Sequence, residues 1–179
     1  NNCLNSILIA KKKYNFDFEV CISDNCSEAN IKELINKYSS FLDITFNRNP
    51  DNLGLGVNIL KAVSLAKGEF VWILGNDDLL LPDTFFYLEK LFINNTSVDF
   101  FYINSFHLDS ALVLSGTQPF DTKNLPNKMK KFSNYSNSFQ SDFFDLVNHN
   151  ISFDFMLGMF LIIFKKRIWD ENLFRINQN

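Results

Sequence analysis

Three short polar clusters carry the residue types that could do chemistry, and the densest of them is Asn76-Asp77-Asp78. It follows an almost wholly apolar run, Glu69 to Leu74, which the pattern predicts to be a buried strand. Adjacent carboxylates repel each other unless a cation lies between them and the oxygens of a ligand, and hard divalent ions bind carboxylate and phosphate oxygens together. The cluster therefore predicts a metal and phosphate site. A capping turn before the helix that Pro82 opens is the structural alternative.

The other two clusters are Asp24-Asn25, after a β-rich run, and the segment from Asn52 to Asn58. Asx residues are common in turns, so Asp24-Asn25 also fits a purely structural turn. In the second segment, Gly54 and Gly56 precede a predicted helix, whose first amide groups could bind an anion. The segment departs from the dinucleotide fingerprint G-x-G-x-x-G because Ile59 occupies the position of the third glycine.

The elements that must position these clusters alternate between helix and strand. Apolar periodicity predicts helices over 4–13, 29–40, 56–66 and 82–94, and strands over 18–23, 43–47, 69–74, 98–106 and 111–114. Ser27 is the predicted cap of the second helix. This alternation predicts an α/β sandwich with a mainly parallel sheet and right-handed crossovers. Ligands of such sheets bind outside the carboxyl ends of the strands, where Asp24 and Asp77 fall.

The rest of the chain has a different texture. Residues 116–137 are rich in Asn, Ser and Lys and are predicted to form a loop. A short helix is predicted over 139–148 and a strand over 159–164, closed by Lys165-Lys166-Arg167. We therefore divide the chain into a first half, 1–106, which holds the three clusters, and a second half of the same domain, 107–179.

Composition sets limits on the class of protein. A chain of 179 residues with 46% hydrophobic and 21% charged residues is typical of one globular domain. A net charge of −3 and a pI near 5.3 disfavour a general nucleic-acid binder. Three cysteines, an odd number, indicate neither a disulfide framework nor a zinc site and favour a reducing cytoplasm. The abundance of Asn is interpreted as a coding bias rather than as chemistry.

No stretch of the sequence is long enough to predict a membrane span. The longest apolar stretch, Ile151 to Phe164, is interrupted by polar residues, and a spanning helix needs about 20 apolar residues.

Taken in order, the clusters resemble glycosyltransferase family 2, which has the GT-A fold. The resemblance rests on the following segments: Asp24-Asn25-Cys26-Ser27, Asn52 to Asn58, Ala66-Lys67-Gly68-Glu69-Phe70, Asn76-Asp77-Asp78 and Pro82-Asp83. It covers about residues 4–106, with a weaker likeness over 160–169.

The resemblance implies an inverting transfer of a sugar from a nucleoside diphosphate donor. Asp77, with help from Asp78, matches the family's metal-binding position and implies Mg²⁺ or Mn²⁺. Asn76 or Gly75 falls where an acidic residue of the family often contacts the ribose. The other donor-binding residues that the resemblance implies are Asp24 and Asn25, at the base, and Asn52, Gly54 and Asn58. The first half thereby becomes the nucleotide-sugar-binding half, and the second half becomes the acceptor side.

One departure from the family is large. The family begins with a strand whose end contacts the nucleotide, whereas this chain starts where the following helix should lie. We therefore expect the chain to be a fragment that lacks the first strand. The family's catalytic base lies after the basic-ended strand. Asp170 and Glu171 are the acidic pair there, and a base beyond Asn179 is the alternative.

The function expected from the resemblance is synthesis of a bacterial surface polysaccharide or a lipid-linked glycan. A non-catalytic glycosyltransferase-like remnant is the first alternative, and a dinucleotide-binding Rossmann domain, resting on Gly54 and Gly56, is the second. The predicted partners are a nucleotide-sugar donor and a glycan or lipid-linked acceptor, without nucleic acid. The predicted location is the cytoplasm. Aromatic and basic residues over 128–132 and 164–169 suggest peripheral contact with the inner face of the membrane.

Overall fold

The computed structural model describes residues 1–126, 128–133, 140–142 and 158–176. Its central strands form two groups. In the first group, β1 (Val20–Asp24) pairs in parallel with β2 (Ile44–Arg48), with Val20 opposite Ile44. In the second, the order is β3 (Phe70–Trp72), β7 (Ile162–Lys165), β4 (Phe100–Tyr102), and β7 is antiparallel to both neighbours. A separate antiparallel ribbon joins β5 (Phe106–His107) to β6 (Lys130–Lys131).

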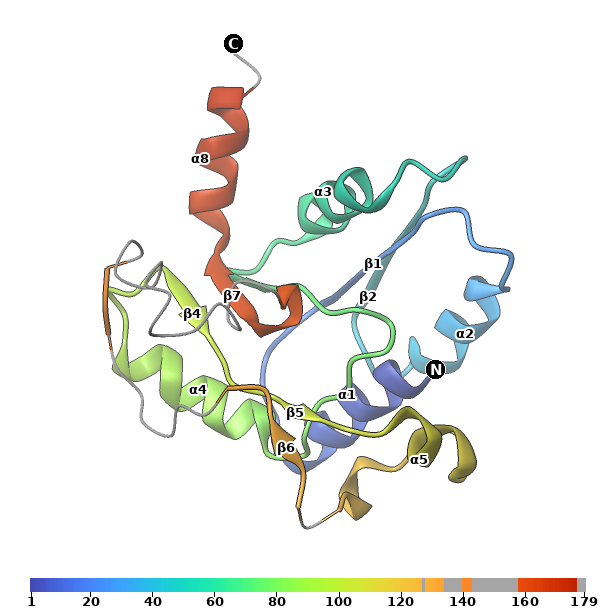
Figure 1. Cartoon of the computed structure of the whole chain (residues 1–179). Helices are drawn as coiled ribbons and strands as arrows, with labels where there is room; N and C mark the ends of the chain where they lie inside the picture. The colour runs from blue at the N-terminus through green and yellow to red at the C-terminus, as the bar shows by residue number, and fades with distance from the viewer. Residues whose placement is uncertain (127, 134–139, 143–157, 177–179) are drawn as a thin grey trace.

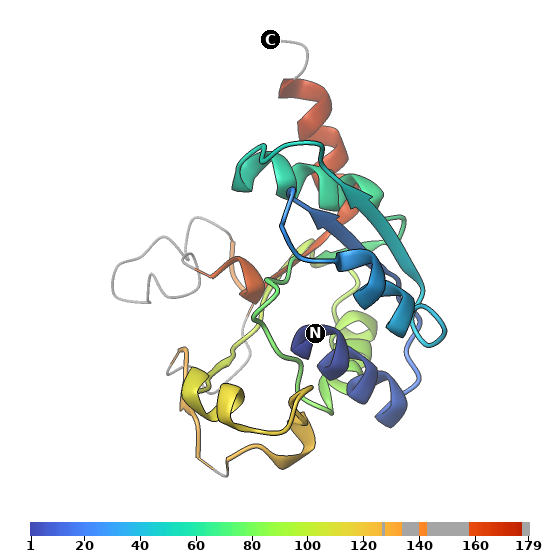
Figure 2. The same ribbon diagram turned by 90° about the vertical axis from the view of Figure 1, so that its right-hand side faces the viewer.

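Helices cover both faces of these strands (Figure 1). On one face lie α1 (Asn2–Lys13), α2 (Ile31–Tyr38) and α4 (Thr84–Asn94), and on the other lies α3 (Leu55–Leu65). The view turned by 90° shows the same layers (Figure 2). The remaining helices are α5 (Ser110–Ser115), α8 (Lys166–Ile176) and the 3₁₀ turns η1 (Thr122–Asn124) and η2 (Met159–Leu161).

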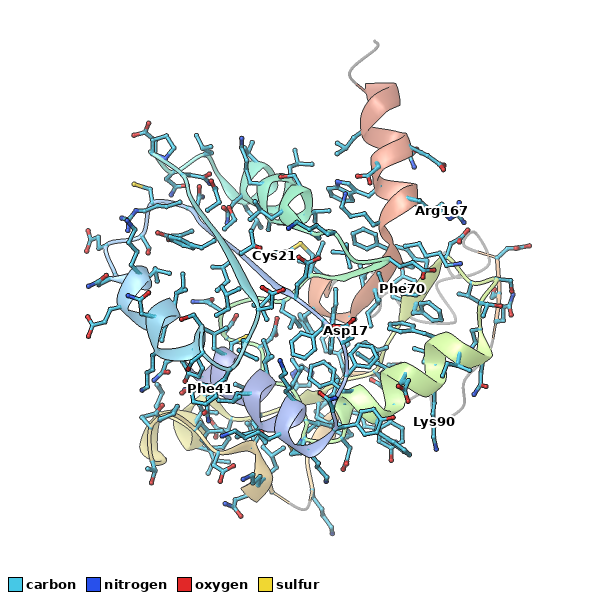
Figure 3. All side chains as sticks on the ribbon, turned by 180° about the vertical axis from the view of Figure 1, so that it is seen from behind. Asp17, Cys21, Phe41, Phe70, Lys90 and Arg167 are labelled. Carbon is cyan, nitrogen blue, oxygen red and sulfur yellow. The ribbon has the colours of Figure 1, made fainter. Side chains whose placement is uncertain are left out.

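Each face of the sheet has its own apolar core. The larger core packs α1, α2 and α4 against both groups of strands, with Ala10 and Ile163 nearly inaccessible to solvent. Aromatic rings fill much of it, and Phe70 lies among them (Figure 3). The Phe70 and Phe92 rings stack with their centroids 4.1 Å apart. The smaller core packs α3 and Trp169 of α8 against β3 and β7. Burial on both faces explains why the strands carry few polar residues.

Two local predictions were wrong. The segment 111–114 is helical, within α5, because the Asp109 side chain accepts a hydrogen bond from the Ala111 N–H and caps the helix. The cap of α2 is Asn30, whose side chain accepts from the Glu33 N–H, and not Ser27. The Ser27 N–H instead donates to Asp24 Oδ1, at 3.1 Å, and so belongs to the turn after β1. Most of the helix predicted over 139–148 lies outside the described residues.

β7 links the two halves of the chain. It comes from the second half, yet it lies between β3 and β4 of the first half and supplies Ile163 to the larger core. The two halves therefore share one sheet.

The strands β1 and β3 each have a free edge. Among the described residues β1 pairs only with β2, and β3 pairs only with β7. The two strands begin close together, because Glu19 Oε1, just before β1, accepts from the Gly68 N–H at 2.9 Å, just before β3. Both then run toward the right-hand side of Figure 1. Their carboxyl ends therefore lie on the same side of the molecule.

Candidate functional site

The turn after β3 holds two adjacent carboxylates against a glycine. The Gly75 N–H donates to Asp78 Oδ2 at 2.6 Å, and the Asp78 N–H donates back to the Gly75 carbonyl at 3.3 Å. A Cβ on Gly75 would lie 2.7 Å from Asp77 Oδ1 and 3.1 Å from Asp78 Oδ2. Only glycine leaves room for both carboxylates in this turn.

The two carboxylates differ in environment. Asp77 is exposed, and within the described part of the chain its carboxylate makes no hydrogen bond or ion pair. Asp78 is partly buried, and this burial raises its pKa; the Gly75 N–H opposes the shift, and the nearby charge of Asp77 adds to it. One carboxylate is therefore fixed, while its neighbour is open to a ligand.

Helix α1 is hydrogen-bonded to the segment that follows this turn. The Leu80 N–H donates to Ser6 Oγ at 2.9 Å in a buried contact. Burial, and next the charge of Asp78, raise the pKa of the Cys3 thiol to about 11. The turn is therefore attached to a packed helix, which holds it in place.

The donor set at this turn suits a divalent ion that shares its ligands with a phosphate. Among the described residues no group of three His, Cys, Asp or Glu side chains could hold a metal. Mg²⁺ sites, however, commonly use one or two carboxylates together with substrate phosphate oxygens and water. Asp77 and Asp78 meet that requirement. They do not form a closed metal cage.

The carboxyl end of β1 carries a buried carboxylate. Asp24 is 8% exposed, its Oδ1 accepts from the Ser27 N–H, and its Oδ2 accepts no hydrogen bond from any residue that the structure describes. The nearest cation is the Arg48 guanidinium at the end of β2, 3.4 Å from Oδ2. This ion pair offsets part of the cost of burying the carboxylate, but Oδ2 still accepts no hydrogen bond, so it is a candidate to bind a ligand N–H group.

Asn25 is engaged with the loop that leads to α3. Its Oδ1 accepts from the Leu53 N–H at 2.9 Å, and its Nδ2 donates to Asn52 Oδ1 at 2.7 Å. Asn52 Oδ1 also accepts from the Gly54 N–H at 3.0 Å. Gly54 has a φ of 80°, which favours glycine, and α3 starts at the next residue. The structure thus brings Asn25, Asn52 and Gly54 together.

Asn58 lies in the first turn of α3 and joins the same cluster. Its Nδ2 donates to the Ser23 carbonyl at 3.1 Å, and its Oδ1 accepts from Ser23 Oγ at 2.7 Å. Asn76, by contrast, is exposed and belongs to the turn after β3. The predicted donor-binding residues therefore lie at the carboxyl ends of β1 and β3 and at the start of α3.

Asn47 and Asn49, which are not among the donor-binding residues predicted from sequence, also belong to the cluster. Asn47 Nδ2 donates to Asn49 Oδ1 at 3.0 Å, and Asn49 is 3% exposed. The signal that could have indicated them is their position at the end of the second strand, where the carboxyl ends of the strands meet the proposed site. The interpretation of Asn as coding bias concealed that signal.

The candidate base residues lie elsewhere. Asp170 accepts two hydrogen bonds from Lys166 Nζ, at 2.6 and 2.9 Å, and Glu171 Oε1 lies 3.9 Å from the Arg167 guanidinium. Both are exposed residues of α8, which projects away from the sheet (Figure 1). The structure does not bring them to the turn after β3.

The two aromatic and basic segments differ in exposure. Phe164 and Lys165 are buried, and Lys165 Nζ lies 3.3 Å from Asp99 Oδ1. Lys128, Lys130 and Lys131 are exposed. Among the helices that the structure describes, none has both the length and the apolarity that a membrane span requires.

A solved structure shares this fold. The crystal structure of S. aureus TarS 1-349 superposes with a TM-score of 0.64 and 22% identity, covering 96% of this chain and 44% of that one. This likeness shows the fold, and it confirms the predicted α/β GT-A architecture. The layers in Figure 1, with helices on both faces of the strands, agree with this architecture.

The family follows from sequence. The glycosyl transferase family 2 model matches residues 1–160, so the chain belongs to that family, and the resemblance is confirmed. Abequosyltransferase RfbV of Salmonella typhimurium is 42% identical over 76 residues, or 41% of this chain and 23% of that protein. The uncharacterized glycosyltransferase MJ1057 of Methanocaldococcus jannaschii is 31% identical over 91 residues, or 50% and 31%. The chain spans less than a third of either relative.

Proposed function

We propose that this chain is the donor-binding part of a glycosyltransferase that moves a sugar from a nucleoside diphosphate to a glycan or lipid-linked acceptor in bacterial surface polysaccharide synthesis. The observation that carries the proposal is the turn after β3, where Gly75 fixes Asp78 and leaves the carboxylate of Asp77 open. Membership of the family and the name of the relative RfbV, an abequosyltransferase, support it.

In this proposal, Asp77 and Asp78 hold Mg²⁺ or Mn²⁺ against the donor diphosphate. Members of the family typically use a divalent metal, and when bound the ion neutralises charge on the leaving diphosphate. Asp78 contributes a carboxylate whose direction is fixed by the Gly75 N–H, and Asp77 contributes the exposed carboxylate. Asn76, beside them, is exposed and is proposed to contact the ribose.

The nucleoside is proposed to lie at the end of β1. Asp24 Oδ2 is buried, accepts no hydrogen bond among the described residues and forms an ion pair with Arg48, so it is proposed to accept an N–H from a base beside that ion pair. The loop from Asn52 to Gly54 would line the other side of the base. The first N–H groups of α3, which lack carbonyl partners within the helix, are available to an anion.

An inverting transfer needs a base that takes the proton of the acceptor hydroxyl as that oxygen attacks the sugar. The ion pairs of Asp170 and Glu171 and the direction of α8 count against either residue in that role. We propose that the base comes from another part of the full protein. Substitution of both residues by Asn and Gln should then leave transfer unchanged.

A lipid-linked acceptor would place the protein at the inner face of the membrane. Support comes from the exposed Lys128, Lys130 and Lys131, which could contact anionic headgroups. The segment 164–169 supports this contact less, because Phe164 and Lys165 are buried and Lys166 and Arg167 form ion pairs with Asp170 and Asp99. Flotation with anionic liposomes at low and raised salt tests this contact. Absence of binding at low salt would remove it.

The test of the donor site uses thermal shift of the chain with a panel of nucleoside diphosphates and nucleotide sugars, with and without Mn²⁺, and with NAD. We expect metal-dependent stabilisation by one nucleotide class. Asp77→Asn should weaken that binding at least about tenfold while the fold survives, because one metal ligand is lost. Unchanged binding and metal dependence in the variant would refute the assignment.

The same panel separates the alternatives. Stabilisation by NAD and by no nucleotide sugar would favour a dinucleotide-binding domain. Metal-dependent nucleotide binding without turnover, in a chain that carries all its family's segments, would favour a non-catalytic remnant.

A further inference from the structure

The carboxyl ends of β1 and β2 are joined to the start of α3 by a network of asparagine side chains. Its five members, called here the asparagine network, are Asn25, Asn47, Asn49, Asn52 and Asn58. Ser23 completes it through hydrogen bonds to Asn58. The network joins the end of β1 to the end of β2, which comes 24 residues later in the chain, and to the start of α3, and all three border the proposed nucleoside site.

Asn49 lies at the centre of this network. Its Nδ2 donates to Asn25 Oδ1 at 3.1 Å and to Asn58 Oδ1 at 3.0 Å, and its Oδ1 accepts from Asn47 Nδ2 at 3.0 Å. Its backbone N–H donates to the Asp24 carbonyl at 2.8 Å. At 3% exposure the side chain is almost fully buried. It must donate twice and accept once in a place that water does not reach, which only a carboxamide can do here.

The direction of each hydrogen bond fixes the next side chain. Because Asn49 donates, Asn25 must present Oδ1 toward it, and the same Oδ1 accepts from the Leu53 N–H. Asn25 Nδ2 is thereby turned toward Asn52 Oδ1, which accepts from the Gly54 N–H. The loop before α3 thus takes its position from a buried residue that does not itself border the solvent.

We propose that Asn49 is a positioning residue for nucleotide binding: it sets the orientation of Asn25 and, through it, the position of the loop from Asn52 to Gly54 against the nucleoside. The inference rests on the proposed function of this site. It adds a residue that has no contact with the ligand and acts through the loop. A carboxylate at position 49 could not donate, and it would face the oxygens of Asn25 and Asn58.

The first measurement needs no ligand. Backbone amide hydrogen exchange reports the hydrogen bonds of the Leu53 and Gly54 N–H groups directly. Asn49→Asp should reduce the protection of both amides at least about tenfold, because Asn25 turns or loses its place. Asn36→Asp, which adds the same charge on the exposed face of α2, should leave both unchanged. Retained protection at both amides in Asn49→Asp would overturn the proposal.

A second variant covers the case in which Asn49→Asp does not fold. Asn25→Asp keeps Oδ1 as an acceptor for the Leu53 N–H but loses the donor to Asn52. We expect the Gly54 amide to lose protection while the Leu53 amide keeps it. If the Gly54 amide of this variant keeps the protection that it has in the unaltered chain, the described series of hydrogen bonds is wrong.

The link to function is measured separately. Calorimetric titration of UDP, CDP, GDP and dTDP with Mn²⁺ identifies the nucleotide that the unaltered chain binds. Asn49→Asp should lower that affinity at least about tenfold with a native circular dichroism spectrum and a melting temperature above the assay temperature, which a purely structural role would not predict. Unchanged affinity would overturn the proposal. Failure of the unaltered chain to bind any of the four would instead count against the proposed function, while the exchange data still test the network.

Discussion

Gly75 and Asp77 approach so closely that a single added methyl group on the glycine would lie 2.7 Å from the carboxylate oxygen Oδ1. The atoms that a Cβ would meet belong to side chains, those of Asp77 and Asp78, and not to the backbone. The turn can therefore accept a larger residue only by moving both proposed metal ligands. A substitution at Gly75 is therefore a sensitive probe of the site, because it displaces both carboxylates without removing either of them.

The first prediction is that Gly75→Ala preserves the fold and weakens metal-dependent nucleotide binding at least about tenfold, because displacement of catalytic groups by about 1 Å commonly costs that much or more. Thermal shift with Mn²⁺ and the nucleoside diphosphate panel measures it. Gly68→Ala is the matched control, since a Cβ there meets its nearest atom, the Phe70 carbonyl oxygen, at an ordinary 3.6 Å. Equal binding by the two variants would contradict the described turn.

The second prediction concerns the effect of Asp78 on how the stability of the fold depends on pH. Partial burial raises its pKa in the folded chain, so the folded state binds the proton more tightly than the unfolded state does. Protonation therefore stabilises the fold at pH values below the ordinary pKa of an aspartate, and this stabilisation is lost as the pH rises through the raised pKa. Asp78→Asn, which keeps an oxygen acceptor for the Gly75 N–H, should melt at a higher temperature at pH 7.

The difference between Asp78→Asn and the unaltered chain should shrink as the pH falls below the raised pKa of Asp78. Thermal unfolding without metal, over pH 3 to 8, measures it. Asp17→Asn, a change at an exposed residue, provides the control. A variant that is less stable than the unaltered chain at pH 7 would show that the charge of Asp78 is favourable in the fold.

The third prediction concerns the cysteines. Burial raises the pKa of both Cys3 and Cys21 to about 11, so at pH 8 only about 0.1% of either thiol is ionised. Cys26 is exposed. A disulfide reagent should therefore modify one thiol quickly in the folded chain and all three after unfolding. Cys26→Ser should remove the fast phase, and a fast phase that survives this substitution would show that a second thiol is accessible.

Periodicity and turn chemistry were enough to predict most of the architecture. Strands such as β1 and β2 carry β-rich runs bounded by Asx turns, and the order of the clusters indicated which strand ends meet. The sequence did not indicate that 111–114 is helical, because the deciding contact is a single cap by Asp109. Its four apolar residues are too few to distinguish a strand from a helix.

The candidate site was predicted in part for a similar reason. Asp24, Asn25 and Asp77 stand out because they follow apolar strands. Asn49 does not stand out, because its role depends on burial, and its side chain becomes buried, at 3% exposure, only when β1, β2 and α3 come together. In a chain so rich in asparagine, the residue type alone carries little information.

The position of β7 has a consequence for synthesis of the protein. β3 and β4 leave the ribosome first, yet neither pairs with the other, because the strand that joins them is β7, which follows the whole of the 107–161 region. Such long-range pairing slows folding and leaves apolar strands uncovered while translation continues. Until β7 emerges, Phe70 and Phe101 lack the strand against which β3 and β4 pair. We therefore expect ribosome-associated chaperones to bind stalled nascent chains that end before β7 and to release those that end after it.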